Sequence, residues 1–205
     1  MSKSPINYSL YLVTDRDLLY GKDIVATVEQ AILGGVTIVQ IREKSLSTRE
    51  FFQCALLLKG ITAKYGVSFI VNDRTDIALA IDADGLHIGQ DDMPLSVARR
   101  LLGPNKIIGV SAATLKQALT AQAGGADYLG VGAVFPTTTK DDASNVSLQM
   151  LQEIKRQVNI PVVAIGGINE NNISKVMATG VDGAAVVSAI VAARDPYGSA
   201  RKLRQ

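Results

Sequence analysis

Polar residues suited to phosphate and metal binding follow several short apolar runs in this sequence. Cations follow the run at 37–41, and carboxylates follow the runs at 68–71 and 85–88. Cations neutralise phosphate oxygens, and carboxylates can hold a Mg²⁺ ion that bridges to those oxygens. The pattern therefore predicts chemistry on a phosphorylated group. The residues concerned are Gln40, Arg42, Lys44, Asn72, Asp73, His87, Gln90, Asp91, Asp92, Ser111, Thr137, Thr139 and Lys140.

A second phosphate site is predicted near the end of the chain. The apolar run at 161–165 leads into Gly166 and Gly167, and the run at 183–187 leads into Ser188. Small residues expose backbone N–H groups, which can close on phosphate oxygens. A helical pattern at 171–179 joins the two runs, so we expect a parallel βαβ unit with an anion cradle that uses no metal. The alternative is that these glycines only permit tight turns and close packing.

Simpler interpretations exist for the polar residues taken singly. Asp73 and Asp92 stand just before expected helices, where aspartate is a favoured N-cap. Arg42 and Glu43 could form a solvated pair, and His87, the only histidine, is expected to be a satisfied core or rim residue rather than a catalyst. The functional interpretation is favoured because suitable groups follow almost every expected strand.

The elements that must position these residues alternate regularly along the chain. Helical patterns at 24–33, 47–65 and 196–203 are the clearest, and Ser47 with Glu50 forms a capping box. A loose internal repeat ends a helix just before a strand, at Thr37, Asp84, Asp127 and Asp182. The eight expected strands span 9–15, 37–41, 68–71, 85–88, 106–110, 128–131, 161–165 and 183–187.

Eight strands alternating with helices predict an α/β protein, a single closed (β/α)₈ TIM barrel that occupies residues 1–205 as one domain. An open doubly wound sheet is the alternative, but none of the eight runs is polar enough for an edge strand. In a closed barrel the carboxyl ends of the strands carry the active site. Every residue singled out above would then lie at one rim.

Composition limits the classes of partner. The chain has 205 residues, 47% of them hydrophobic and 20% charged, and a formal charge of +2, which gives no basic surface for nucleic acid. No apolar run is long enough to span a membrane. The single cysteine, Cys54, excludes an internal disulfide and lies in an apolar helical segment, so we expect it to be buried. We expect a cytoplasmic protein that acts on small molecules, and the sequence leaves association into a homo-oligomer open.

Seven short runs, in order and in register, resemble the thiamine phosphate synthase family. They span nearly the whole chain, and together they are far more specific than any one of them. The runs are QIREK at 40–44, VND at 71–73, HIGQDD at 87–92, GVS at 109–111, FPTTTK at 135–140, IGGI at 165–168 and VS at 187–188.

The resemblance implies a reaction and a role for each residue. Hydroxymethylpyrimidine pyrophosphate would lose pyrophosphate, and the ring nitrogen of thiazole phosphate would capture the pyrimidinylmethyl cation. Asp73 and Asp92 would hold one Mg²⁺ on the pyrophosphate, and Gln40 would contact the pyrimidine. The pyrophosphate would be bound by Arg42, Lys44, Asn72, Ser111 and Lys140, of which Arg42, Lys44, Ser111 and Lys140 are the expected catalytic residues. The thiazole phosphate would be placed by Thr137, Thr139, Gly167, Val187 and Ser188.

One departure from the family's pattern separates the related alternatives. Many relatives carry histidine two residues after the serine of the GVS run, and here that position is Ala113. The loss counts against a thiazole tautomerase-like paralogue, which would rely on a histidine in that region to move a proton. A non-catalytic barrel that binds thiazole phosphate or thiamine phosphate is the other alternative, and it would have no use for a carboxylate pair beside a pyrophosphate pocket.

Overall fold

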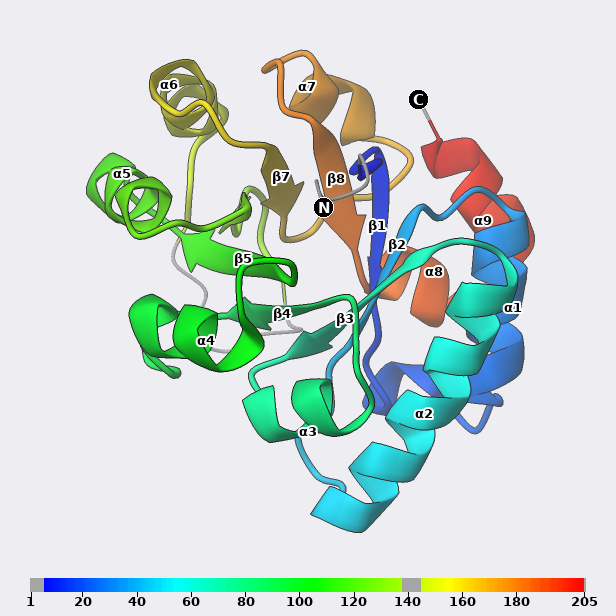
Figure 1. The fold of residues 1–205 in the computed structure, drawn as a ribbon. Coiled ribbons are helices and arrows are strands. Elements are labelled where there is room, and N and C mark those ends of the chain that lie inside the picture. Colours follow the sequence, from blue (N-terminus) through cyan, green and yellow to red (C-terminus); the bar gives the residue numbers. More distant parts are fainter. Residues whose placement is uncertain (1–5, 138–144, 205) are drawn as a thin grey trace.

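The structure, a computed structural model, describes residues 6–137 and 145–204. Within these residues, eight parallel strands pair in chain order, and β1 pairs with β8 to close a barrel (Figure 1). The predicted (β/α)₈ barrel is confirmed, and the open sheet is wrong. The extent of the domain over residues 1–205 stays a prediction. The strands are β1 (Leu10–Val13), β2 (Ile38–Ile41), β3 (Ser68–Asn72), β4 (Gly85–Ile88), β5 (Ile107–Ala112), β6 (Tyr128–Gly132), β7 (Val162–Ile165) and β8 (Gly183–Val186).

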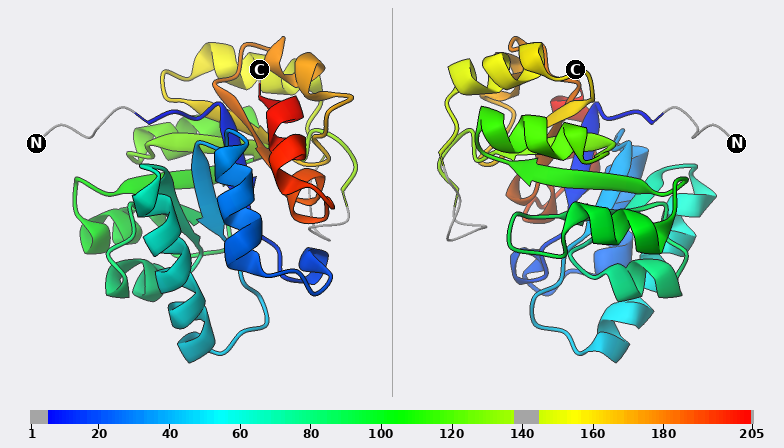
Figure 2. Two further views of the ribbon diagram at one scale, coloured as in Figure 1. Left: turned by 90° about the vertical axis from the view of Figure 1, so that its right-hand side faces the viewer. Right: turned by 60° about the vertical axis from the view of Figure 1, so that its left-hand side comes forward.

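Helices surround the barrel on its outer side (Figures 1 and 2). The predicted capping box is present at the start of α2, where Ser47 and Glu50 bond to each other's backbone N–H. The short helices η1 and α8 were not predicted, because three or four residues carry no periodic signal. The helices are η1 (Asp17–Leu19), α1 (Ile24–Leu33), α2 (Thr48–Lys64), α3 (Thr75–Ala80), α4 (Leu95–Leu102), α5 (Leu115–Ala123), α6 (Leu148–Gln157), α7 (Ile173–Met177), α8 (Ser188–Val191) and α9 (Pro196–Leu203).

Helix α9 completes the outer ring by packing beside α1 (Figure 2). Gly34, which follows α1, allows this approach. A Cβ atom at Gly34 would lie 2.5 Å from the carbonyl oxygen of Tyr197 and 2.7 Å from the Cβ of Ala200. Helices α1 and α9 therefore pack at a distance that only glycine at position 34 permits.

Two apolar cores result from the alternation of side chains along each strand. Outward-facing residues such as Leu10 and Leu12 pack with the helices, whereas Tyr11 and Val13 point into the barrel. Layers of side chains from alternate strands fill barrels of this kind. The inner core is small and contains two fully buried tyrosines, Tyr11 and Tyr128.

Side chains hold the amino-terminal end of the barrel at four equivalent places. Near the start of each odd-numbered strand, a backbone N–H donates to an oxygen from the loop that precedes the next strand. The pairs are Leu10 with Thr37 (3.2 Å), Phe69 with Asp84 (2.7 Å), Ile108 with Asp127 (2.7 Å) and Val162 with Asp182 (2.7 Å). The loose repeat in the sequence is therefore a repeated strand clamp, and we use that name for these four contacts.

The burial of the cysteine and the absence of a membrane-spanning run were also predicted from the sequence. Cys54 is buried, as predicted, with its sulfur 3.6 Å from a guanidinium nitrogen of Arg16. Among the described residues, the longest helix, α2, has 17 residues, and no helix combines the length and apolar character needed to cross a bilayer.

Candidate active site

A cavity of about 630 Å³ opens at the carboxyl ends of the strands. Strand pairing brings the predicted residues level there, since Gln40 pairs with Val13, Asn72 with His87, and Ser111 with Gly130. Thr139 and Lys140 lie outside the described residues. All the other predicted site residues line this one cavity: Gln40, Arg42, Lys44, Asn72, Asp73, Asp92, Ser111, Thr137, Gly167, Val187 and Ser188.

Arg42 is held in the cavity wall by the end of β1. Its Nη1 lies 3.1 Å from Oδ2 of Asp15, and its backbone N–H donates to Oγ1 of Thr14 (3.1 Å). Both charged side chains of this pair are 14% exposed, so the guanidinium is largely fixed before any ligand arrives. Asp15 was not predicted as a site residue, because nothing local shows that β1 ends beside β2.

Glu43 turns away from the cavity, and the suggested Arg42–Glu43 pair is wrong. Its carboxylate accepts two hydrogen bonds from Arg16, at 3.1 and 2.8 Å, and only 1% of its side chain is exposed. Successive residues in a strand point to opposite faces, and Arg42 and Glu43, directly after β2, likewise face different partners. The ion pair of Glu43 with Arg16 ties the β2 loop to the residue before η1.

Asp73 and Asp92 are not helix caps. Helix α3 has Arg74 at its N-cap position and α4 has Pro94, and neither makes a side-chain cap. Asp73 adopts a left-handed backbone conformation (φ 63°), and Oδ2 of Asp92 accepts the N–H of Gly89 at 2.7 Å, which closes the loop after β4. The capping interpretation is therefore wrong, because neither carboxyl group accepts a hydrogen bond from the first turn of a helix.

The two carboxyl groups contact each other at the rim. Partial loss of hydration and the hydrogen-bonding Asp92 carboxyl raise the pKa of Asp73 to about 7, against a smaller opposing effect of Asn72 and Arg42. Asp73 itself remains accessible from the cavity. Two like charges this close favour a shared proton or a cation between them. The donor set fits Mg²⁺, which prefers carboxylate oxygens.

Strands β7 and β8 supply backbone rather than charge. Gly166 and Gly167 have φ angles of +105° and +62°. A Cβ atom at Gly167 would lie 2.6 Å from the carbonyl oxygen of Pro136 and 2.8 Å from the Cβ of Phe135. Close packing of the β6 loop thus requires glycine here, as the simpler interpretation held, while Gly167 also lines the cavity.

Two asparagines that the sequence did not single out orient this backbone. The Nδ2 atoms of Asn169 and Asn172 donate to the carbonyl oxygen of Gly167, at 3.3 and 3.0 Å. The C=O and N–H of a trans peptide point in opposite directions, so this aims the N–H of Ile168 away from the asparagines. Ile168 lines the cavity as well.

A buried polar chain forms the floor of the cavity. It consists of five residues whose hydrogen bonds run across the barrel: Gln40 Nε2 to Tyr11 Oη (2.6 Å), Tyr11 Oη to Tyr128 Oη (2.7 Å), Tyr128 Oη to His87 Nδ1 (2.9 Å) and His87 Nε2 to Ser111 Oγ (3.0 Å). His87 is thus a satisfied, buried residue, as expected. The two tyrosines were missed, because an aromatic residue inside an apolar run is indistinguishable from ordinary core.

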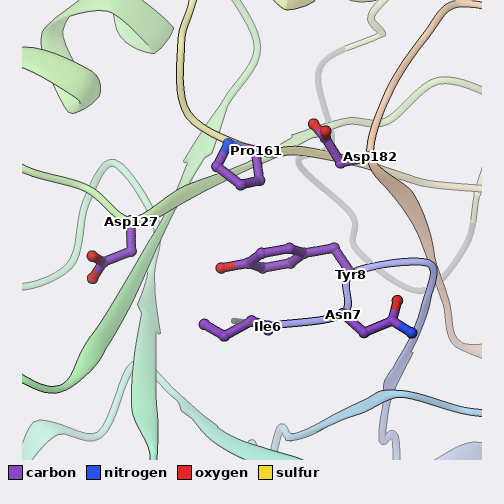
Figure 3. Close-up of a pocket in the computed structure, with 6 residues that line it drawn as sticks. All are labelled: Ile6, Asn7, Tyr8, Asp127, Pro161 and Asp182. Carbon is purple, nitrogen blue, oxygen red and sulfur yellow. The ribbon is translucent and has the colours of Figure 1, made fainter. Parts of the chain in front are cut away.

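A second cavity, of about 480 Å³, lies at the opposite end of the barrel (Figure 3). Its carboxylates belong to the strand clamp and are already paired. Asp127 also binds Arg99 (2.6 Å), and Asp182 also binds Lys155 (2.6 Å). None of the predicted site residues lines it.

The fold and the rim together define a class of protein. A closed parallel barrel with cations, a carboxylate pair and glycine-lined backbone at the carboxyl ends of its strands is typical of (β/α)₈ barrels that act on phosphorylated small molecules. The family model described as thiamine monophosphate synthase matches residues 10–190. The chain belongs to this family, which confirms the family predicted from the seven runs.

Relatives support the same assignment over almost the full length. The thiamine-phosphate synthase of Clostridium acetobutylicum is 57% identical over 196 residues, which cover 96% of this chain and 93% of that protein. The thiamine-phosphate synthase of Clostridium tetani is 54% identical over 195 residues, covering 95% and 93%.

Solved structures agree with the fold. The thiamine phosphate pyrophosphorylase from Pyrococcus furiosus superposes with a TM-score of 0.90 at 46% identity, covering 97% of this chain and 94% of that one. A 3-hexulose-6-phosphate synthase superposes with a TM-score of 0.67 at 17% identity, a likeness of fold alone.

Proposed function

We propose that this protein is a thiamine-phosphate synthase, a transferase that condenses hydroxymethylpyrimidine pyrophosphate with hydroxyethylthiazole phosphate and releases pyrophosphate. The observation that supports this most directly is that one cavity contains both kinds of phosphate-binding group. It contains both the cations suited to a pyrophosphate and the glycine-lined backbone suited to a monophosphate. Two phosphorylated substrates can therefore bind side by side with their reacting ends together.

Departure of pyrophosphate is the step that needs charge stabilisation. Arg42, Lys44, Asn72 and Ser111 come from three different strand ends and line the same cavity. As the C–O bond breaks, negative charge grows on the leaving group, and donors already in position stabilise it without reorganising. The contact of Arg42 with Asp15 keeps one such donor in place. Lys140, which lies outside the described residues, is proposed to add a further cation.

Asp73 and Asp92 are the residues that would hold Mg²⁺. Within the described residues, no group of three or more histidines, cysteines or carboxylates forms a metal site. Mg²⁺ commonly uses one or two carboxylates and completes its shell with water and substrate phosphate, so a pair suffices. Bound there, the ion would supply positive charge to the pyrophosphate oxygens. The protein's own part is to keep the two carboxylates together at the rim.

Capture of the pyrimidinylmethyl cation requires position rather than a base. Gln40 is proposed to hold the pyrimidine, and the backbone at Gly167, Val187 and Ser188, with Thr137 and Thr139, is proposed to hold the thiazole phosphate. The thiazole nitrogen is already nucleophilic and gives up no proton on attack. Ala113 lines the cavity and can move no proton, which agrees with this chemistry and not with a tautomerase.

The remaining partners follow from the reaction. We place the protein in the cytoplasm, with small-molecule substrates and with no nucleic acid or membrane as partner. The weak net charge of +2 and the single cysteine support this placement. Association into a homo-oligomer stays a prediction for measurement in solution.

Release of pyrophosphate is the decisive assay. The protein is mixed with both substrates and Mg²⁺, and a coupled assay follows pyrophosphate while chromatography follows thiamine phosphate. Equal amounts of both products, and neither when one substrate is left out, are expected. Binding of thiamine phosphate without turnover would instead indicate a non-catalytic barrel. Isomerisation of a thiazole phosphate without the pyrimidine would indicate a tautomerase.

A further inference from the structure

The buried polar chain across the cavity floor connects residues with different proposed roles. Gln40, at one end, faces the proposed pyrimidine site, and Ser111, at the other end, faces the proposed pyrophosphate site. Tyr11, Tyr128 and His87 lie between them and are 1%, 1% and 8% exposed. We call these five residues the relay. Polar atoms this deeply buried are costly unless each has a partner, and here each does.

Neighbouring strands are built to make room for the relay. Gly109 lies inside β5, where a Cβ atom would overlap the Tyr128 ring. Gly130 lies inside β6, where a Cβ atom would lie 2.9 Å from Cε1 of His87. Glycine weakens a strand interior, and its presence there marks a close approach by another group. Two strands thus carry glycine at the positions that admit the side chains of Tyr128 and His87.

With Nε2 of Gln40 as the donor to Tyr11, one continuous arrangement of protons runs along the relay. Nε2 of Gln40 donates to Tyr11, so the proton of Tyr11 is directed to Tyr128, and that of Tyr128 to Nδ1 of His87. A neutral imidazole that accepts at Nδ1 carries its proton at Nε2. Nε2 therefore donates to Oγ of Ser111. The Ser111 proton is left to point into the cavity.

Rotating the Gln40 amide by half a turn would reverse every bond. Ser111 would then donate to the imidazole and present only lone pairs to the cavity, which suits an anion poorly. We propose that Tyr11, Tyr128 and His87 are positioning residues that transmit the orientation of the Gln40 amide to the Ser111 hydroxyl, so that Ser111 is a donor towards the leaving group.

The tyrosines are suited to this role because they stay protonated. Burial raises the pKa of Tyr11 and of Tyr128 well above the ordinary tyrosine value. Each hydroxyl therefore has one proton to give and can accept one bond, which makes the relay directional. A pyrimidine amino group that donates to Oε1 of Gln40 would hold the amide in the orientation seen here.

The role of Ser111 as a donor to the leaving group rests on the proposed function. The direction of the hydrogen bonds along the relay does not depend on that function. It can be measured without any substrate. His87 is the only histidine in the chain, so protein prepared without a histidine tag gives one imidazole signal set. Long-range ¹H–¹⁵N correlation spectra show which ring nitrogen is protonated.

We expect the neutral tautomer with the proton at Nε2 in the unmodified protein. Tyr128→Phe removes the donor to Nδ1 and should shift the tautomer population. Tyr8→Phe is the matched control, because Tyr8 packs on the same ring at a centroid distance of 5.2 Å but takes no part in the relay. It should leave the spectrum unchanged. A proton at Nδ1, or a doubly protonated ring, in the unmodified protein overturns the proposal whatever the protein's activity.

Kinetics then tests the coupling between the two ends. Gln40→Met and Ser111→Ala, made singly and together, form a double-mutant cycle in the kcat/KM for the pyrimidine substrate. The two changes should be non-additive by about threefold or more when Tyr128 is present. The non-additivity should vanish in a Tyr128→Phe background and persist with Tyr8→Phe. Additive effects in the unmodified background overturn the transmission, and melting temperatures of each variant separate this from loss of fold.

Discussion

The two ends of the barrel use the same residue type for opposite purposes. At the amino-terminal end, where Figure 3 shows Asp127 and Asp182 at the second cavity, each of these carboxylates accepts a strand N–H and pairs with a cation. At the carboxyl end, Asp73 and Asp92 contact each other. Asp127 and Asp182 are each paired with a cation of the protein and stabilise the fold. Asp92 also accepts a backbone N–H, but it faces Asp73 and not a cation, so that pair needs a proton or a bound cation. An aspartate at a cavity is therefore structural when a cation of the protein neutralises it, and a candidate functional residue when it faces another carboxylate. Neither the residue type nor the presence of a cavity makes this distinction.

The largest effect is expected from Asp73→Asn and Asp92→Asn. Each removes a proposed Mg²⁺ ligand and should lower kcat/KM by about a thousandfold, in line with the loss of a major electrostatic contribution. Stability should barely change, because asparagine tolerates the left-handed backbone at Asp73 and can still accept the Gly89 N–H at Asp92. Steady-state kinetics over a range of Mg²⁺ concentrations, with thermal melts, checks both parts. Equal losses of stability and activity would show that Asp73 and Asp92 stabilise the fold, as Asp127 and Asp182 do at the amino-terminal end.

Lys140→Ala should have the next largest effect. Lys140 lies outside the described residues, and the hypothesis that it reaches the pyrophosphate when its loop closes stays a prediction. A contact made mainly in the transition state lowers kcat and kcat/KM together, here by roughly a hundred- to a thousandfold. Lys140→Arg should recover only part of the rate, because its donors are arranged differently.

Lys155→Ala is the matched control at the amino-terminal end. Lys155 binds Asp182 at 2.6 Å, and both side chains are partly exposed. Turnover should be normal, with stability lowered by about 1 kcal/mol or less. A Lys140→Ala protein that also turns over normally would make Lys140 a solvated loop charge.

A smaller, selective effect is expected from Gly167→Val. The new side chain would press on Phe135 and Pro136 and alter the backbone proposed to hold the thiazole phosphate. We expect KM for the thiazole phosphate to rise about tenfold, which is about 1.4 kcal/mol, with little change for the pyrimidine substrate. Gly180→Val shares a positive φ (+85°) but has no atom within 4 Å of the added Cβ, so it controls for backbone strain. Equal loss of affinity for both substrates would contradict the division into two phosphate sites.

No effect on turnover is expected from Asp127→Asn, and its cost should fall on stability alone. The change weakens the bonds to Arg99 and to the Ile108 N–H. We expect the free energy of unfolding to fall by about 1–2 kcal/mol with kcat unchanged. Denaturant unfolding and steady-state kinetics on one preparation check this. A clear loss of turnover without loss of stability would give the amino-terminal cavity a functional role.

Local sequence was enough to find most of the candidate site. Arg42, Asn72, Asp92 and Ser111 were recognised because each follows or ends an apolar run, and parallel strands in a barrel all end at one rim. Ser111 lies within β5, which ends two residues later than expected, but the assignment to the rim does not depend on this difference. The weaker boundaries were those of short elements, such as α7, which is shorter than the pattern at 171–179 suggested.

Residues that work through partners distant in the chain could not be found in this way. Tyr11 and Tyr128 are 117 positions apart and meet only because the barrel closes. Asp15 binds Arg42, and Glu43 binds Arg16 instead of its neighbour, for the same reason. The strand clamp was visible as a loose repeat, but its meaning required knowing which strand each oxygen faces.

The sequence by itself determined the alternation of strands and helices, the closed barrel, the family and the rim on which the polar residues gather. These follow from hydrophobic periodicity, glycine positions and short motifs, which are local properties of the chain. Only the tertiary structure decided which carboxylates are paired with cations and which face each other, and which aromatic residues carry hydrogen bonds through the core. Those outcomes depend on strand register and barrel closure, which bring side chains together across the whole length of the chain.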